Sequence, residues 1–358
     1  MTAAAGAFEP RPHVVIVGAG IAGIAAALRI RTLRPDVLIT VVEATARIGG
    51  KIAGEVVAGC VVDGGADVCI GAKLRATELF TQLRLEERVV TVNPRGLPSL
   101  ERRGHSLTPA PTRFTDELLT FPDGMRELVD AACSALRDVT VVTWTPVTEI
   151  SRIAGAWNVH FGSGSYPGDA VILAVPADAA ARLLSAVAPR ESGALADLQC
   201  PPTTTVTMAW EQSDVPCPFD ATGYMVTDPS DTVTACTWTS SKIPSHAAHG
   251  AALVRGYVRG SGDGASAAVL YEVRSTLGIT ARPLFSRTYA WPAGIPVYTP
   301  AHASAVAKLT DVLSTHPGLY VAGSAFHGVG IPDCIASGER AANAAVAHLS
   351  LLPATTGT

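Results

Sequence analysis

The strongest constraint on the fold lies near the N-terminus, where an apolar run at residues 14–17 leads into Gly18-Ala-Gly20-Ile-Ala-Gly23 and an alanine-rich stretch. In such a strand, turn and helix, Gly18 permits the sharp turn, Gly20 lets a pyrophosphate approach the backbone, and Gly23 lets helix and strand touch. The unpaired N–H groups and the positive dipole end of the helix then bind the phosphates. The motif predicts a Rossmann-like dinucleotide site that includes Gly18, Gly20, Ile21, Ala22 and Gly23.

An acidic residue at the end of the second predicted strand supports this site. The strand covers residues 37–42 and ends at Glu43, about 20 residues beyond the glycines, where an acid hydrogen-bonds a ribose hydroxyl. A carboxylate there favours an unphosphorylated ribose, so FAD or NAD is expected rather than NADP. A glycine motif alone could be another tight turn, but together the strand, the helix and the acid favour the dinucleotide site.

The segment after the acid distinguishes FAD from NAD. It contains two glycines between two cations, a flexible turn suited to the far side of the pyrophosphate. Here the sequence resembles the flavin amine oxidase superfamily, and within it the protoporphyrinogen and coproporphyrinogen oxidase group. The resemblance implies non-covalent FAD and a glutathione-reductase-like cofactor domain. The residues expected at the cofactor in this stretch are Glu43, Ala44, Arg47, Gly49, Gly50 and Lys51.

Three further segments carry the resemblance. Residues 61–67 look like the segment that passes beside the isoalloxazine ring in that group, and Val147 matches a valine that lies against the adenine. Residues 323–338 resemble the loop and helix start that wrap the ribityl chain and the pyrimidine edge. The resemblance therefore adds these residues to the FAD site: Gly65, Ala66, Asp67, Val147, Gly323, Ser324, Gly330, Ile331, Pro332 and Ile335.

The order of the predicted elements indicates an α/β fold with two domains. A Rossmann-like FAD-binding domain is expected over residues 1–80, 121–187 and 312–358, and a β-rich α+β substrate domain over residues 81–120 and 188–311. One face of the substrate sheet, which is expected to be mixed or antiparallel, would roof the flavin. Predicted helices cover residues 77–88, 125–136 and 177–187; predicted strands cover residues 139–144, 169–175, 203–210, 223–227, 233–238, 253–259 and 284–291; and the proline-broken stretch 93–120 is expected to be a loop or lid.

Composition narrows the class of protein. The 358 residues are 48% hydrophobic and 16% charged, enough to bury two cores, and a net charge of −4 gives no reason to expect nucleic acid. Seven scattered cysteines without a CxxC pair argue for a reducing compartment and against a zinc site.

No signal peptide or transmembrane span is visible, so a cytoplasmic enzyme is expected. His246 and His249 have a metal-like spacing, but a solvated loop is the favoured interpretation and no metal site is predicted.

The largest departure from the family is one of length. The protoporphyrinogen oxidase group carries a helical domain that shapes the substrate cavity, and here only residues 72–121 occupy that place. Ile243 and Val297 stand where tryptophan and glutamine are usual, so the substrate side has diverged more than the cofactor side. We therefore expect a smaller or more open pocket, no membrane contact and poor turnover of porphyrinogens. An oligomer in which a second subunit completes the pocket is the alternative.

The cofactor is expected to supply the chemistry, by accepting a hydride or its equivalent, so no residue is required as a general base. Tyr298 and His327 are the catalytic candidates near the ring, with sheet packing and a loop hydrogen bond as their alternatives. Cys334 is expected to pack the helix start rather than tether the flavin, and Asp333 to cap that helix. Arginines that could bind substrate carboxylates, although a solvent-facing role is the simpler interpretation, are Arg75, Arg95, Arg102, Arg103 and Arg113.

Three functions follow as alternatives. The leading prediction is an FAD-dependent oxidoreductase that removes hydride from a C–H bond next to nitrogen in a small molecule of specialised metabolism. Molecular oxygen is the expected acceptor, because the sequence contains no second nicotinamide motif and no cysteine cluster for an iron–sulfur centre. The second function is oxidation of coproporphyrinogen or protoporphyrinogen in haem biosynthesis. The third is a flavin-binding partner protein without catalysis.

Overall fold

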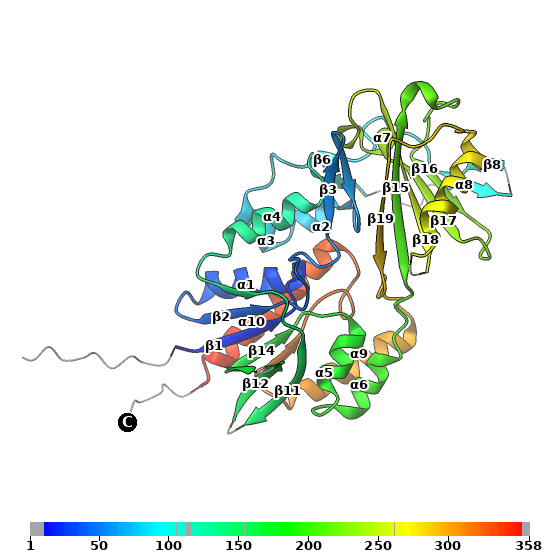
Figure 1. Ribbon diagram of the computed structural model, residues 1–358. Coiled ribbons are helices and arrows are strands. Elements are labelled where there is room, and N and C mark those ends of the chain that lie inside the picture. The colour runs from blue at the N-terminus through cyan, green and yellow to red at the C-terminus, as the bar shows by residue number, and fades with distance from the viewer. Residues whose placement is uncertain are drawn as a thin grey trace, which may run out of the picture.

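A parallel five-stranded sheet forms the centre of one half of the molecule (Figure 1). The computed structural model describes residues 11–352, apart from 105, 112–115, 154, 163 and 261. The strands lie in the order β10-β2-β1-β14-β20 and all neighbours are parallel. They are β1 (His13–Val17), β2 (Leu38–Val42), β10 (Thr140–Val142), β14 (Ala170–Leu173) and β20 (Leu319–Val321). Segments from both ends of the chain therefore share one sheet.

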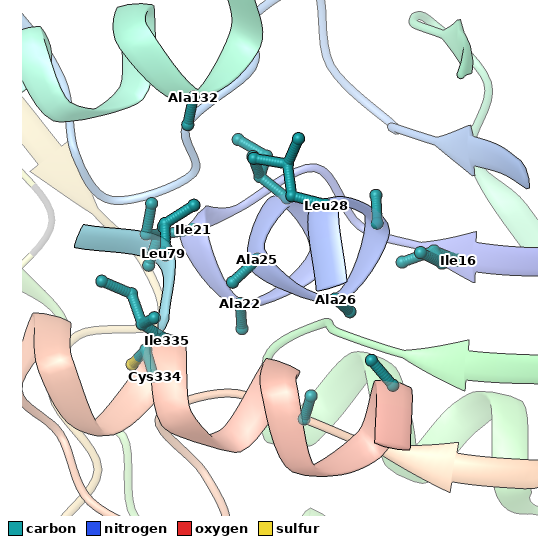
Figure 2. Close-up of a cluster of buried hydrophobic side chains, with 14 of the residues drawn as sticks. Ile16, Ile21, Ala22, Ala25, Ala26, Leu28, Leu79, Ala132, Cys334 and Ile335 are labelled. Carbon is teal, nitrogen blue, oxygen red and sulfur yellow. The ribbon is translucent and has the colours of Figure 1, made fainter. Parts of the chain in front are cut away.

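Two long helices from opposite ends of the chain pack on this sheet, α1 (Ile21–Leu33) and α10 (Ile331–Leu349). Helix α1 is rich in alanine, and its small side chains let α10 approach closely. Figure 2 shows Ala22 and Ala25 on the side of α1 that faces α10, with Ile335 of α10 beside them. The apolar core continues from α1 to Leu79 and Ala132 on neighbouring helices.

A second sheet of seven strands lies in the other half, in the order β19-β15-β18-β17-β16-β7-β8. Only the β16–β7 pair is parallel within the described part of this sheet. Helix α8 (Ala265–Leu277) covers one face, and its Val269 sits so close to Gly256 that a Cβ there would collide. The strands are β7 (Leu100–Arg103), β8 (Ser106–Pro109), β15 (Thr203–Glu211), β16 (Gly223–Val226), β17 (Val233–Trp238), β18 (Ala251–Arg259) and β19 (Phe285–Trp291).

Smaller elements connect and flank the two sheets. The additional strands are β3 (Gly54–Val57), β4 (Cys60–Asp63), β5 (Cys69–Ile70), β6 (Val90–Thr91), β9 (Leu118–Thr120), β11 (Val147–Ile153), β12 (Ala156–Phe161) and β13 (Gly164–Gly168). The additional helices are α2 (Gly71–Arg75), α3 (Glu78–Leu83), α4 (Arg126–Ala135), α5 (Ala177–Leu184), α6 (Pro189–Ala196), α7 (Thr239–Lys242), α9 (Pro300–Ser314) and the short 3-10 turns η1 (Gln212–Asp214) and η2 (Pro244–His246). The predicted α/β fold with a parallel cofactor sheet and a mixed substrate sheet is confirmed.

The prediction of a loop or lid over residues 93–120 is wrong in part. A hairpin of β7 and β8 lies within this stretch and extends the edge of the seven-stranded sheet. Arg102 explains why: its buried guanidinium lies 2.8 Å from Glu272 and 2.6 Å from Asp231, so the hairpin is fixed by ion pairs rather than left in solvent. Arg102 is therefore not solvent-facing, and Arg113 lies outside the described residues.

The predicted helix over residues 77–88 is also too long. Helix α3 ends at Leu83, because Arg84 adopts a left-handed backbone with φ +55°. Helix α5 likewise ends three residues before the predicted boundary at 187. No helix in the described residues is long and apolar enough to cross a membrane.

Candidate functional site

The turn after β1 contains three glycines with different surroundings. A Cβ on Gly18, whose φ is +102°, would collide with the carbonyl oxygen of Ala174, and a Cβ on Gly23 would collide with that of Gly18. Backbone packing therefore requires both glycines. Gly20 differs, because its Cβ would meet only the Cα of Gly50, at 3.9 Å. Gly20 is the N-cap of helix α1, and no side chain caps the backbone N–H groups of the first turn. The open space at Gly20 therefore lies beside backbone donors that a pyrophosphate can use.

The second glycine pair lies directly against this turn. The amide of Gly49 donates to the carbonyl oxygen of Ala19 at 2.8 Å, and both Gly49 and Gly50 have positive φ. The Arg47 guanidinium donates to the carbonyl oxygens of Gly50 (2.6 Å) and Ile52 (3.1 Å) and thereby holds the loop. Burial lowers the pKa of Arg47. Its prominent role here is to shape the backbone that faces the turn.

Lys51 connects this loop to the second half of the molecule. Its Nζ donates to the carbonyl oxygen of Gly294 at 2.6 Å, in the segment that follows β19. Burial lowers the pKa of Lys51. The cation predicted beside the pyrophosphate therefore also joins the cofactor loop to the substrate sheet.

Glu43 lies at the end of β2, as predicted. One carboxylate oxygen accepts from the amide of Ala19 at 2.9 Å, and the other accepts from the amide (2.9 Å) and hydroxyl (2.7 Å) of Thr45. The acid is thereby fixed beside the glycine turn. Ala44 is exposed next to it, and Val147 begins strand β11, two residues after Thr145, whose amide donates to the carbonyl oxygen of Glu43.

The C-terminal segment reaches the same place. The amide of Gly323, whose φ is +114°, donates to the Ser337 hydroxyl at 3.1 Å, and a Cβ on Gly323 would meet only Ala22, at 3.9 Å. Asp333 caps helix α10 by accepting from the amide of Gly330 at 3.2 Å, which agrees with its predicted role. The loop leading to Ile331, Pro332 and Ile335 therefore lies beside the start of α1.

The two catalytic candidates lie close together in the structure. The Tyr298 hydroxyl donates to the carbonyl oxygen of Ser324 at 2.7 Å and accepts from the amide of Gly328 at 2.6 Å, while its ring stacks on His302. His327 is exposed, and its Nδ1 lies 3.4 Å from the Ser337 hydroxyl. Both residues line an open hollow of about 440 Å³ beside α9. Tyr298 organises the 324–328 loop, and a catalytic role for either residue stays a prediction.

The substrate sheet holds the turn at residues 64–65. The Thr205 hydroxyl and the Trp291 indole N–H both donate to the carbonyl oxygen of Gly64, at 2.6 and 2.9 Å, and Arg255 donates to that of Gly65. A Cβ on Gly65 would collide with the carbonyl oxygen of Lys51. The segment predicted to pass the flavin ring is thus fixed by one face of the second sheet.

Buried charges lie behind this turn. Asp67 lies 3.0 Å from Lys242 and 3.6 Å from Arg255. Burial acts to raise the pKa of Asp67, but these two cations hold that pKa at about 2. Sequence reasoning missed Lys242 and Arg255 as partners of this segment. A signal was present for Arg255, because a lone charge in the strand Leu-Val-Arg-Gly-Tyr-Val needs a buried partner.

The prediction of a solvated loop at the two histidines is wrong for the first of them. His246 is 1% exposed, and its Nε2 lies 2.9 Å from the carbonyl oxygen of Phe121, whereas His249 is exposed. The chain buries His246 because η2 packs against β4. No group of potential ligands in the described part of the chain is placed to hold a metal ion.

The residues at this site fit a dinucleotide. The open space at Gly20, the N-terminus of α1 and the carboxylate of Glu43 provide backbone donors for phosphates and an acceptor for a ribose hydroxyl. Apolar side chains are exposed in two segments adjacent in sequence to residues described above: Ile295 and Val297 follow Gly294, and Val329 precedes Gly330. Their exposed fractions are 65%, 42% and 45%.

Comparison with known proteins agrees with this arrangement. The family model described as flavin containing amine oxidoreductase matches residues 99–346, and an NAD(P)-binding Rossmann-like domain matches residues 16–83. A coproporphyrinogen III oxidase of Bacillus subtilis is 30% identical over 64% of this chain and 51% of its own length, and one from Propionibacterium freudenreichii is 33% identical over 63% and 44%. The chain thus spans about half the length of these curated relatives.

The fold has a close counterpart among solved structures. A putative protoporphyrinogen oxidase from Exiguobacterium sp. 255-15 superposes with a TM-score of 0.85, at 23% identity, over 96% of this chain and all of that one. The family match covers most of the chain and includes the C-terminal segment at the site. The chain is a member of the flavin-containing amine oxidoreductase family.

Proposed function

We propose that this enzyme binds FAD non-covalently and oxidises a porphyrinogen of the coproporphyrinogen type. The names of the curated relatives support this substrate better than the small nitrogen-containing molecule that we expected from the sequence. FAD at this site would accept the hydride or its equivalent. The chain itself would bind the phosphates at Gly20 and orient the substrate against the turn at residues 64–65.

The observation that carries the proposal is the surface of the substrate sheet beyond that turn. Paired residues of neighbouring strands lie on the same face of a sheet. Arg255 contacts Gly65, so its side of β18 faces the cofactor half, and the same side carries Tyr257. Tyr257 pairs with Ala235, and Ala235 pairs with Met225, which is 48% exposed. This row is apolar from β18 to β16 and continues to Glu101 on β7.

Two exposed arginines lie at one edge of the same face. Arg259 ends β18 two residues after Tyr257, and Arg103 ends β7 two residues after Glu101, which pairs with Met225. Since β7 and β18 both run parallel to β16, the two arginines lie at the same edge of the sheet. A wide apolar surface with guanidinium groups at its edge suits a macrocycle that carries several carboxylates.

A second candidate substrate is a small nitrogen-containing molecule. Its support is the short stretch between residues 72 and 121, part of which is used for the β7–β8 hairpin at the sheet edge. Fewer residues are then left to enclose a large substrate. A small ligand could instead be bound near the exposed Ile295, Val297 and Val329.

Anaerobic mixing of the FAD-loaded enzyme with freshly reduced coproporphyrinogen III tests the proposal. We expect flavin bleaching at catalytic speed and, in air, porphyrin fluorescence that appears faster than without enzyme. Bleaching by cyclic amines but not by porphyrinogens would contradict the proposed substrate and favour the second candidate.

Molecular oxygen is the proposed acceptor. Peroxide should then form in proportion to the substrate oxidised. Reduced enzyme that persists in air, and is reoxidised only by a quinone or a protein partner, would contradict this acceptor while leaving the substrate proposal intact.

A further inference from the structure

Asp63 and His246 come from different halves of the molecule and meet in its interior. Asp63 ends strand β4 and directly precedes the turn at residues 64–65, whereas His246 ends η2, which follows α7 in the second half. The two residues are 5% and 1% exposed. Neither belongs to the proposed cofactor or substrate contacts.

The hydrogen-bond partner of His246 fixes which ring nitrogen carries hydrogen. Nε2 lies 2.9 Å from the carbonyl oxygen of Phe121, and a carbonyl oxygen can only accept. Nε2 must therefore be the donor. In a neutral ring Nδ1 then has a free lone pair, and this nitrogen faces Oδ2 of Asp63 at 3.8 Å.

The Asp63 carboxyl group has one bonded and one unbonded oxygen. Oδ1 accepts from the amide of Met125 at 2.9 Å, whereas Oδ2 is buried and has no hydrogen-bond partner among the described residues. A charged oxygen that is buried without a hydrogen-bond donor loses its hydration and is strongly disfavoured. Protonation of Oδ2 removes this cost, and a small side-chain movement would bring the new O–H donor to Nδ1.

Among the residues that the structure describes, no charged group offers Asp63 a closer partner. The groups that face the pair are Asp67, Lys242 and Arg255. Both cations pair with Asp67: Lys242 lies 3.0 Å from its carboxylate and Arg255 lies 3.6 Å from it. Asp67 is itself ionised and repels a second carboxylate, which further favours the neutral acid at Asp63.

We infer that Asp63 is an uncharged carboxylic acid in the folded protein and that it directs its proton to Nδ1 of His246. The two residues then form a neutral pair that positions the turn at residues 64–65 against η2. This inference holds whichever substrate the enzyme oxidises.

The electrostatic directions agree with a neutral pair. Burial, followed by the neighbouring Asp67, raises the pKa of Asp63 to about 7. Burial also lowers the pKa of His246. Both changes leave the proton on the carboxyl group.

The pair has a distinctive effect on the pH dependence of folding. Between about pH 4.5 and 6 the folded pair holds one proton on Asp63, and the unfolded chain holds one proton on His246, since the unperturbed pKa values are about 3.9 and 6.5. The proton numbers cancel, so the pair contributes no pH dependence in this range. Removing either partner breaks the cancellation, and the two removals do so with opposite signs.

In Asp63→Asn, the amide can donate to Nδ1 and its oxygen can still accept from Met125. The folded variant holds no proton at the pair, while the unfolded chain still protonates His246. Relative to wild type, its unfolding constant should rise about tenfold for each unit that the pH falls below 6.

In His246→Gln, the folded protein keeps the proton on Asp63, whereas the unfolded chain loses that proton. The unfolding constant of this variant should therefore rise about tenfold per pH unit, relative to wild type, as the pH increases from 4.5 to 6.

The experiment is urea unfolding of the full-length FAD-loaded protein and both variants across this pH range, with ¹⁵N-histidine NMR of the wild type at pH 6. The His246 signals, identified by their loss in His246→Gln, should show one protonated and one unprotonated ring nitrogen. Two protonated nitrogens would overturn the inference, even if Asp63→Asn fails to fold. Parallel pH profiles for wild type and both variants would overturn it as well.

Discussion

A Cβ on Gly338 would fall well inside 3.0 Å of the carbonyl oxygen of Ala22. Gly338 lies within α10, near the end of the chain, and Ala22 lies in the first turn of α1. The close helix contact therefore depends on a residue without a side chain. It brings the two glycine-rich ends of the chain to one site.

Gly338→Ala should push α10 away from α1. We expect destabilisation by about 1 to 3 kcal/mol, the usual cost of overpacking, and weaker retention of FAD. Thermal unfolding and the FAD content of the purified protein measure both effects. Gly193→Ala, in helix α6 with nothing within 4 Å of its Cβ, is the matched control and should be neutral or slightly stabilising. Equal stability of the two variants would show that the helix contact is looser than described.

Gly20→Ala should separate cofactor binding from folding. The position has φ −71° and open space around its Cβ, so the apoprotein should change in stability by less than about 1 kcal/mol. FAD content should fall at least about tenfold, because the methyl group would occupy the space proposed for the pyrophosphate. Gly23→Ala is the comparison, and it should lose stability instead. Undiminished FAD binding by folded Gly20→Ala would place the phosphates elsewhere.

Glu43→Ala should weaken FAD binding by roughly 1.5 to 3 kcal/mol, the range for a hydrogen bond to a charged group. The substitution also removes acceptors for the amides of Ala19 and Thr45, so unfolding of the apoprotein has to be measured alongside. Titration of the apoprotein with FAD gives the change in Kd. An unchanged Kd would argue against a ribose contact at this acid.

Arg259→Gln should raise KM for a porphyrinogen with little effect on FAD content, because Arg259 lies at the exposed edge of the substrate sheet. A single exposed charge contact is worth about 0.2 to 1 kcal/mol, so an increase of up to about fivefold is expected. Arg190→Gln is the control, because Arg190 is an exposed arginine on α6, outside the substrate sheet. Identical KM values for both variants would remove Arg259 from the proposed substrate surface.

The cofactor half could be predicted from the sequence because its constraints are local. The turn after β1, the acid at the end of β2 and the cap at Asp333 each follow from a few consecutive residues. The fully buried strand β14 was also visible as an apolar run. Patterns of this kind can be recognised without knowing which distant segments the residues contact.

The missed features depend on contacts between distant segments. Arg102 looked like a solvent-facing side chain until Glu272, 170 positions away, gave it a buried partner. His246 looked like part of an exposed loop, but the carbonyl oxygen of Phe121 and the packing of η2 on β4 bury it. A sequence pattern indicates that a buried charge needs a partner without saying which residue supplies it.

If the two ends of the chain form one site for non-covalent FAD, acid precipitation of the purified protein releases the cofactor. We expect a yellow protein that releases about one FAD per chain into the supernatant and leaves a colourless pellet. A yellow pellet would contradict non-covalent binding. A protein that binds NADPH but no flavin would contradict the FAD site itself.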